Sequence, residues 1–182
     1  MDFTASPEDN TILFYGGMGS PQNIKAFFRF FQNILPKVKT IIPEIKCIIV
    51  GSDPHKSITK LHNGKNVVVT GYVDDVREHI SKSAVMILPL SLGAGFRSRM
   101  VEVMAMGVPV VGTHNALDNI EMTHKKQGFI SDSDDEMANY LVTVLSDTSL
   151  REKMSNECKK FVLEKYSIES TYGRLSDYYQ NL

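Results

Sequence analysis

The chain has 182 residues, of which 42% are hydrophobic and 23% charged, a composition typical of a folded globular protein. That length fits one domain whose core needs no disulfide or metal to stabilise it. The formal net charge of -1 provides no overall field to hold a nucleic acid or an anionic membrane, so any anion site must be local.

The cysteines and histidines favour a protein without disulfides or a metal site. Cys47 and Cys158 lack metal-ligand spacing and are too few for a disulfide framework, which favours reduced thiols. The five histidines form no ligand pair on one helical face, so no metal site is expected. No apolar run approaches the roughly 20 residues that span a bilayer, and no basic stretch precedes a hydrophobic one at the N-terminus. We therefore expect a cytoplasmic protein without a transmembrane segment.

Short apolar runs rich in β-branched residues alternate with amphipathic stretches of helical length, which indicates repeated strand-helix units. Several runs are apolar at successive positions, as strands buried on both faces of a parallel sheet must be. Strands are predicted at residues 11–15, 45–50, 66–70, 85–90, 108–113 and 128–130. Helices are predicted between them at residues 22–34, 56–62, 73–81 and 98–106. This order predicts an α/β fold with a doubly wound, mostly parallel sheet of about six strands and right-handed crossovers.

The two ends of the chain differ from this repeat. Residues 1–10 contain a Ser-Pro-Glu-Asp-Asn run and resemble a linker, which leaves residues 11–182 as a single domain. After Ser131, a Ser-Asp-Ser-Asp-Asp run supplies N-cap chemistry, and three helices are predicted at residues 134–146, 150–164 and 168–181. We expect the tyrosines of the last segment to pack against the sheet in preference to a partner surface: Tyr166, Tyr172, Tyr178 and Tyr179.

Ligands of an open parallel sheet bind outside the carboxyl ends of its strands, so the loops that leave the strands are the expected site. The first strand leads into a Gly-Gly-Met-Gly-Ser-Pro run at residues 16–21. Its glycines let backbone N–H groups approach a phosphate at a helix N-terminus, although a flexible turn before a proline explains them equally well. The run is not a dinucleotide fingerprint, because Gln22 occupies the third glycine position, and it lacks the Gly-Lys-Ser/Thr of a Walker loop.

The fourth predicted strand leads into a Ser-Leu-Gly-Ala-Gly-Phe-Arg-Ser-Arg run at residues 91–99 and then into a helix. This run is a second candidate anion cradle, because the glycines allow close approach and the helix directs free N–H groups at the loop. Arg97 and Arg99 flank the positive end of the helix dipole, a conflict that a bound anion would relieve. Separately solvated surface arginines are the alternative.

Two further positions carry possible binding groups. Glu102 lies one turn from Arg99, and its carboxylate either pairs with that arginine or accepts hydrogen bonds from the vicinal hydroxyls of a ribose. The third predicted strand leads into a Gly-Tyr-Val-Asp-Asp run, in which Asp74 or Asp75 is placed to cap the next helix. Tyr72 of that run either presents its edge to a base or is an ordinary aromatic at the sheet edge.

Together these runs resemble the C-terminal domain of the group 1, retaining glycosyltransferases of the GT-B fold, over nearly the whole chain. The sharpest similarity covers residues 89–111, where the family shows a Glu, seven intervening residues and a second Glu, followed by Ala-Met-Ala-x-Gly-x-Pro-Val-Val. The Gly-Tyr-Val-Asp-Asp run and the Phe-Tyr-Gly-Gly-Met end of the first strand, with Asn23 in the following helix, are similar too. The joint order and spacing of these motifs make the resemblance specific.

The resemblance implies a site for a nucleotide diphosphate sugar, with Glu102 as the second Glu on the ribose hydroxyls. The first Glu would fall at position 94, which is Ala94, so the usual carboxylate contact to the sugar is missing. A subgroup of the family carries Gly-Ala-Gly-x-Arg-x-Lys instead, with Arg99 here in place of the Lys. The donor-binding residues implied in this way are Gly16, Gly17, Met18, Tyr72, Val73, Gly93, Ala94, Gly95, Phe96 and Glu102.

The family's diphosphate-binding Arg and Lys in the first loop are also absent, because Gly17 and Gln22 or Asn23 occupy their approximate positions. Arg97 and Arg99 are therefore the candidate catalytic residues, with the role of stabilising the leaving diphosphate.

The implied activity is hexosyl transfer from the nucleotide sugar to a saccharide or lipid-linked acceptor, in the synthesis of cell-surface polysaccharide or glycoconjugates. The resemblance implies no cofactor, no metal ion and no nucleic-acid partner. Family members enclose the active site between two Rossmann-like domains, so we expect the N-terminal acceptor-binding domain to be missing and the isolated chain to be inactive. Peripheral membrane association of the full protein is compatible with this activity.

Two alternatives remain open from the sequence. One is a non-catalytic α/β nucleotide-binding or regulatory module. A receiver-like domain is an example, but this sequence lacks the acidic cluster that such a domain carries at the end of its first strand. The other is a nucleotide-sugar epimerase of the same architecture.

Overall fold

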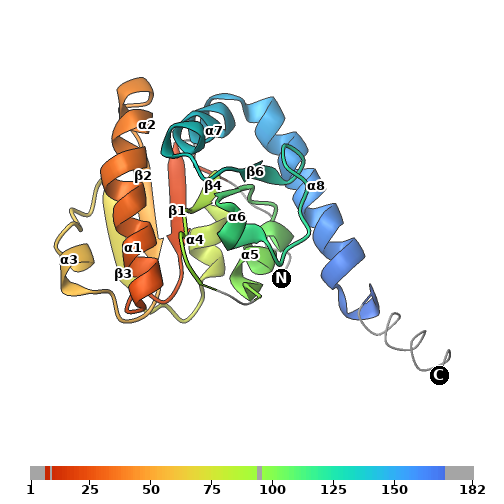
Figure 1. Cartoon of the computed structure of the whole chain (residues 1–182), viewed down its shortest axis with the longest axis horizontal. Helices are drawn as coiled ribbons and strands as arrows, with labels where there is room; N and C mark the ends of the chain where they lie inside the picture. The colour runs from red at the N-terminus through yellow and green to blue at the C-terminus, as the bar shows by residue number, and fades with distance from the viewer. Residues whose placement is uncertain (1–6, 9, 94–95, 171–182) are drawn as a thin grey trace.

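The computed structural model describes residues 7–8, 10–93 and 96–170. Within them, six parallel strands form one sheet in the order β3-β2-β1-β4-β5-β6, flanked by helices (Figure 1). This order confirms the predicted doubly wound α/β fold. The strands are β1 (Thr11–Tyr15), β2 (Lys46–Val50), β3 (Val67–Gly71), β4 (Val85–Leu88), β5 (Val110–Gly112) and β6 (Gly128–Ile130).

The helices cover the sheet in two groups. A continuous helical rod made of α1, a π-helical turn η1 and α2 packs with α7 over one face, and α8 packs along α5 (Figure 1). The first group is α1 (Pro21–Arg29), η1 (Phe30–Ile34), α2 (Leu35–Ile41) and α7 (Asp134–Ser146). The remaining helices are α3 (Lys56–Thr59), α4 (Arg77–Ser81), α5 (Ser98–Ala105), α6 (His114–Leu117) and α8 (Thr148–Tyr166).

β4 and β5 are each at least two residues shorter than predicted, and a proline lies where β4 ends and where β5 begins. β4 ends at Leu88, before Pro89, although residues 85–90 were expected. β5 begins after Pro109, although residues 108–113 were expected. Proline has no N–H to donate to a neighbouring strand, so the ladder stops beside it even where the surrounding residues are apolar.

The rod differs from the single helix predicted for residues 22–34, because it continues through Pro36 to Ile41. Leu35 N–H donates to the carbonyl of Phe30, five residues back, which is the hydrogen bond of a π-helical turn. This wider turn accommodates the proline ring, which in a regular α-helix would clash with the carbonyl four residues earlier. The proline therefore widens the helix where the sequence pattern predicted its end.

Other helix boundaries also shift. α4 begins at Arg77, four residues later than predicted, and α3 ends at Thr59. The short helix α6 was not predicted at all, and Thr113 caps it by accepting the N–H of Ala116 at 3.1 Å. The helix predicted at residues 168–181 lies largely outside the described residues, as do Tyr172, Tyr178 and Tyr179.

The core lies on both sides of the two central strands, β1 and β4, whose apolar side chains are fully buried. Phe14 of β1 packs edge-on against Phe27 and stacks with Phe30, which fixes the rod on the sheet. Both cysteines are free and buried, and burial raises the pKa of the Cys47 thiol to about 12. No helix among the described residues has the length and apolarity needed to cross a bilayer.

Candidate functional site

A cleft of about 510 Å³ opens at the carboxyl edge of the sheet, where the strand order reverses between β1 and β4. Such a switch point is the usual ligand site of a doubly wound fold. Four chain segments line the cleft, and all four follow parallel strands. The sequence-predicted residues among the lining are Gly16, Gly17, Tyr72, Val73, Phe96, Arg97 and Arg99.

Two buried residues, Met18 and Asn23, fix the loop between β1 and α1 by hydrogen bonds. Met18 is fully buried, and its N–H donates to the carbonyl of Ser52 at 2.9 Å, so Met18 anchors the loop to the core and does not line the cleft. Asn23, also buried, donates from Nδ2 to the Gly17 carbonyl at 2.8 Å. Among the hydrogen bonds of the described residues, none uses the N–H of Gly17 or Gly19. Of the two, only Gly17 lines the cleft, so its amide remains available to an anion there.

Arg99 reaches from α5 to the end of β1. Its guanidinium lies directly against Gly16, where a Cβ atom would overlap Nη1. Burial, reinforced by the nearby charge of Arg97, lowers the pKa of Arg99. Within the described part of the chain, no carboxylate forms an ion pair with either arginine. The cleft therefore holds two neighbouring cations, one of them half-buried, that no described carboxylate pairs with, although Asp74 also lines the cleft.

Arg97 folds back over the loop that precedes α5. Its Nη2 donates to the carbonyl of Gly93 at 3.1 Å, and burial lowers its pKa. Gly93 has φ of +123°, a backbone conformation that residues with a side chain rarely adopt. Ala94 and Gly95 lie outside the described residues. The loop thus places one guanidinium at the start of α5, where the free N–H groups of the helix also point.

Glu102 does not form the ion pair with Arg99 that its spacing allows. It is exposed and is not among the residues that line the cleft, but its Oε2 accepts a hydrogen bond from the hydroxyl of Tyr15 at 3.2 Å. Tyr15 itself lines the cleft. One carboxylate oxygen of Glu102 is thereby oriented by the protein, and the other has no hydrogen bond from any described residue.

The loop after β3 contributes an exposed aromatic wall. Tyr72 is 74% exposed and follows Gly71, whose φ is +72°. Asp75 accepts the N–H of Arg77, the first residue of α4, at 2.9 Å and also pairs with its guanidinium. The N-cap residue itself is Val76, which makes no side-chain capping hydrogen bond, so neither aspartate is the N-cap and Asp75 supports the helix start from the preceding position.

The sequence analysis did not identify two contributors to the cleft, Tyr15 and the loop that begins at Gly51. Gly51 has φ of +152° and lies against the carbonyl of Gly16, so the two loops touch at their glycines. A glycine directly after a buried strand was the available signal. Among the described residues, no group of three or more His, Cys, Asp or Glu side chains is placed to hold a metal ion.

The strand order and the position of the cleft are those of a Rossmann-like nucleotide-binding domain. The family model described as "Glycosyl transferases group 1" matches residues 9–147, and the chain belongs to that family. Membership does not favour the receiver-like or epimerase alternatives.

Curated relatives are similar over most of this chain. N-acetyl-alpha-D-glucosaminyl L-malate synthase of Bacillus anthracis is 25% identical over 160 residues, which cover 83% of this chain and 42% of the relative. The capsular polysaccharide biosynthesis glycosyltransferase CapM of Staphylococcus aureus is 26% identical over 182 residues, covering 94% of this chain and 46% of the relative. The chain therefore spans less than half the length of these relatives.

Solved structures share the fold at low sequence identity. TarM matches with a TM-score of 0.77 at 16% identity, over 97% of this chain and 37% of that one. Anabaena HepE, solved in complex with UDP, matches with a TM-score of 0.74 at 16% identity, over 96% of this chain and 49% of HepE. The separate C-terminal domain of the Francisella tularensis protein LpcC matches with a TM-score of 0.71 at 15% identity, over 91% of this chain and 96% of that domain.

Proposed function

We propose that this chain is the donor-binding half of a glycosyltransferase and holds a nucleotide diphosphate sugar in the cleft between β1 and β4. The observation that carries the proposal is the guanidinium of Arg99, which is desolvated against Gly16 and has no carboxylate partner within the described residues. Leaving a cation in that position is unfavourable unless an anion joins it. A diphosphate supplies that charge.

In this proposal, each side of the cleft binds a different part of the donor. The diphosphate lies between the free amide of the β1–α1 loop and the two arginines, Arg97 and Arg99. The ribose hydroxyls bind Glu102, whose carboxylate Tyr15 orients. The base lies toward Tyr72 and Val73, which line the outer wall.

The same groups serve the chemistry. When the bond between the anomeric carbon and the diphosphate oxygen breaks, its electron pair stays with the diphosphate. Positive charge already fixed beside that oxygen stabilises the transition state without further reorganisation. Arg97 and Arg99 supply that charge in the proposal, with no cofactor or metal ion assigned a role.

The relatives support the wider setting of this proposal. CapM is named for capsular polysaccharide biosynthesis, and HepE was solved with UDP. We propose a corresponding transfer to a saccharide or lipid-linked acceptor in the synthesis of cell-surface polysaccharide or glycoconjugate. A second, N-terminal domain would bind the acceptor, and the reaction would take place on the cytoplasmic side, with peripheral attachment to the membrane compatible with it.

Titration of the 182-residue chain with UDP and GDP tests the donor site. We expect saturable amide shifts in the four segments that line the cleft for at least one nucleotide. Arg99→Ala should weaken binding about tenfold, since it removes a charge-assisted contact to phosphate. Lys60→Ala is the matched control, because it removes an equal charge from an exposed residue that does not line the cleft. A wild-type chain that responds to neither nucleotide would overturn the proposal.

A further inference from the structure

A second hollow, of about 540 Å³, lies at the same edge of the sheet, outside the ends of β4, β5 and β6. We propose that it is a carbohydrate-binding subsite that holds a neutral saccharide beside the donor cleft, an inference that rests on the proposed function. Polar side chains from the loops after β4 and β6, from α6 and its C-cap, and from the helical rod line it: Arg29, Ser91, His114, Asn115, Asp118 and Asp132.

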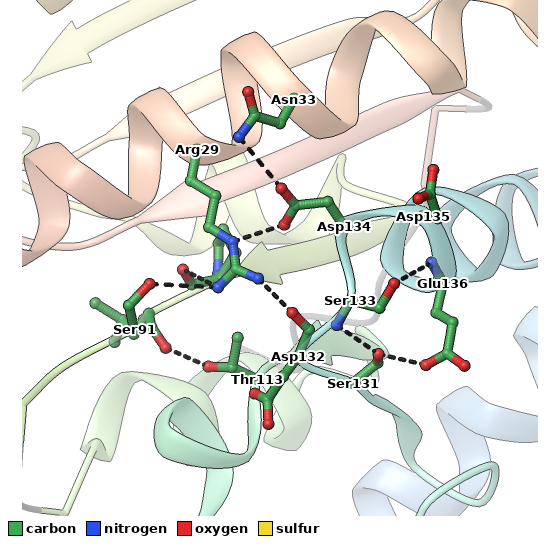
Figure 2. Close-up of polar contacts among 12 residues, drawn as sticks. Arg29, Asn33, Ser91, Thr113, Ser131, Asp132, Ser133, Asp134, Asp135 and Glu136 are labelled. Atoms are coloured by element: carbon green, nitrogen blue, oxygen red, sulfur yellow. Dashed lines mark hydrogen bonds and ion pairs between the residues drawn. The ribbon is translucent and has the colours of Figure 1, made fainter.

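Arg29 fixes the wall of this hollow by joining the rod to two loops (Figure 2). Its Nε donates to Asp134 Oδ1 at 2.6 Å, and its Nη2 donates to the carbonyl of Asp132 at 2.5 Å. Its Nη1 lies 3.4 Å from both the Pro89 carbonyl and Ser91 Oγ. All three nitrogens are engaged and a carboxylate balances the charge, so Arg29 is a structural support and not an anion receptor.

His114 and Asp132 form a polar pair that faces solvent. Asp132 Oδ1 accepts the backbone N–H of His114 at 3.2 Å, and Oδ2 lies 2.9 Å from Nδ1 of the ring. A carboxylate only accepts, so Nδ1 carries the proton of this hydrogen bond, and the second ring nitrogen, Nε2, lies outside the pair. No described residue forms a hydrogen bond with Nε2, and the His114 side chain is 70% exposed. This nitrogen is accessible to a ligand hydroxyl.

The charge of the lining selects against phosphate. Asp118 and Asp132 contribute two carboxylates, while the only cation of the lining, Arg29, is already paired. A negative hollow repels an anion. It suits groups that both donate and accept, because Asp118 and Asp132 accept hydrogen bonds while the Asn115 amide and the Ser91 hydroxyl donate them. Sugar hydroxyls have that property.

The position of the hollow links it to transfer. The loop between β4 and α5 contributes Ser91 to the hollow and Phe96 and Arg97 to the donor cleft. A sugar in the hollow therefore lies at the far side of the loop that holds the diphosphate. That sugar belongs either to the donor or to the acceptor, and the chemistry of recognition is the same for both.

NMR titration of the isotopically labelled 182-residue chain tests this subsite. The probes are methyl α-glucoside, methyl α-galactoside and N-acetylglucosamine, with inorganic phosphate as the anionic comparison. We expect at least one sugar to shift the signals of Ser91, His114 and Asp132 with a dissociation constant of about 1–10 mM, and phosphate to leave them unchanged. Absence of any sugar response there, or a stronger response to phosphate, would overturn the inference.

Variants separate binding from folding. His114→Gln and Asp132→Asn should each weaken the sugar response about fivefold and leave UDP binding unchanged. His55→Gln is the matched control, because His55 is an exposed histidine on the loop after β2, away from the hollow. Equal loss of sugar and UDP binding in the His114 variant would show a merely structural role and contradict the inference.

A last comparison identifies the source of the sugar. If UDP-glucose displaces the free sugar from the hollow and UDP does not, the donor's sugar is the occupant. If the free sugar binds the UDP-glucose complex as well as the free chain, the subsite belongs to the acceptor. Both results support a carbohydrate subsite. A chain that binds sugars here but no nucleotide would refute the donor proposal alone.

Discussion

The hydroxyl of Tyr15 donates a hydrogen bond to Oε2 of Glu102 at 3.2 Å, which joins the end of β1 to the second turn of α5. Burial, followed by the charge of Glu102, raises the pKa of Tyr15, so the phenol remains a donor at neutral pH. This contact orients the carboxylate that we assign to the ribose.

Tyr15→Phe should therefore weaken the binding of a ribonucleotide about fivefold, equivalent to about 1 kcal/mol, because the carboxylate loses its orienting donor. Calorimetric titration with UDP measures this. The 2′,3′-dideoxy analogue is the internal control, since it has no hydroxyls for Glu102 to accept from, and its affinity should not change. An equal loss for both ligands would contradict the assigned role.

Gly16→Ala should chiefly weaken nucleotide binding, whereas Gly51→Ala should chiefly lower the stability of the fold. A Cβ at Gly16 overlaps the flexible end of Arg99, which can swing away, so we expect stability to change by no more than about 1 kcal/mol while UDP affinity falls about tenfold. A Cβ at Gly51 overlaps the Gly16 carbonyl, and its φ of +152° adds strain, so a loss of about 3 kcal/mol is expected.

Denaturant unfolding and nucleotide titration of both variants check this pair. Unchanged affinity in Gly16→Ala would show that the position of Arg99 against β1 does not matter for the ligand.

Arg29→Ala should lower the free energy of unfolding by about 2 kcal/mol, because it removes charge-assisted hydrogen bonds from a side chain that is only 20% exposed. Lys37→Ala is a matched comparison: it removes an ion pair between the same rod and the same end of α7, but the Lys37 and Asp135 side chains are 45% and 77% exposed. Its loss should stay below about 1 kcal/mol. Urea unfolding measures both, and equal losses would contradict this ranking.

His124 should make stability fall in mild acid. Its Nδ1 accepts the N–H of Ile130 at 3.0 Å, and its ring packs edge-on against Phe129 and Tyr140. Burial, with a smaller effect of Lys125, lowers its pKa from 6.5. The unfolded chain therefore takes up a proton that the folded chain resists, so the contribution is complete above pH 6.5 and is lost as the pH falls through the folded pKa.

Thermal unfolding between about pH 7.5 and pH 5.5 measures this dependence. His124→Gln keeps an acceptor but does not titrate, so its melting temperature should fall less over that range than that of the wild type. His79, whose pKa burial also lowers, is present in both proteins and does not affect the difference. Parallel curves would contradict the prediction.

Several helix and strand boundaries follow from the local sequence pattern. The bounds of β1, β6 and α7 agree with the sequence prediction, because apolar runs or N-cap residues define them locally. The predicted end of the first helix was wrong, because a π-helical turn lets the helix continue through Pro36. The predicted start of α4 was also wrong, because the helix begins four residues later than expected. Those outcomes depend on how a helix packs on the sheet, which the local pattern does not contain.

The sequence by itself determined the class of fold, the family, and the loops in which a site must lie, because strand-helix alternation and glycine-rich strand ends are local properties of the chain. Only the tertiary structure decided which groups meet. It buries the Met18 side chain in the core and places the Arg99 guanidinium against Gly16. It also brings Glu102 into a hydrogen bond with Tyr15, 87 residues away. It also brought Arg29 to Asp134 across 105 residues. Such contacts depend on strand order and loop path, and these are fixed by packing of the whole core.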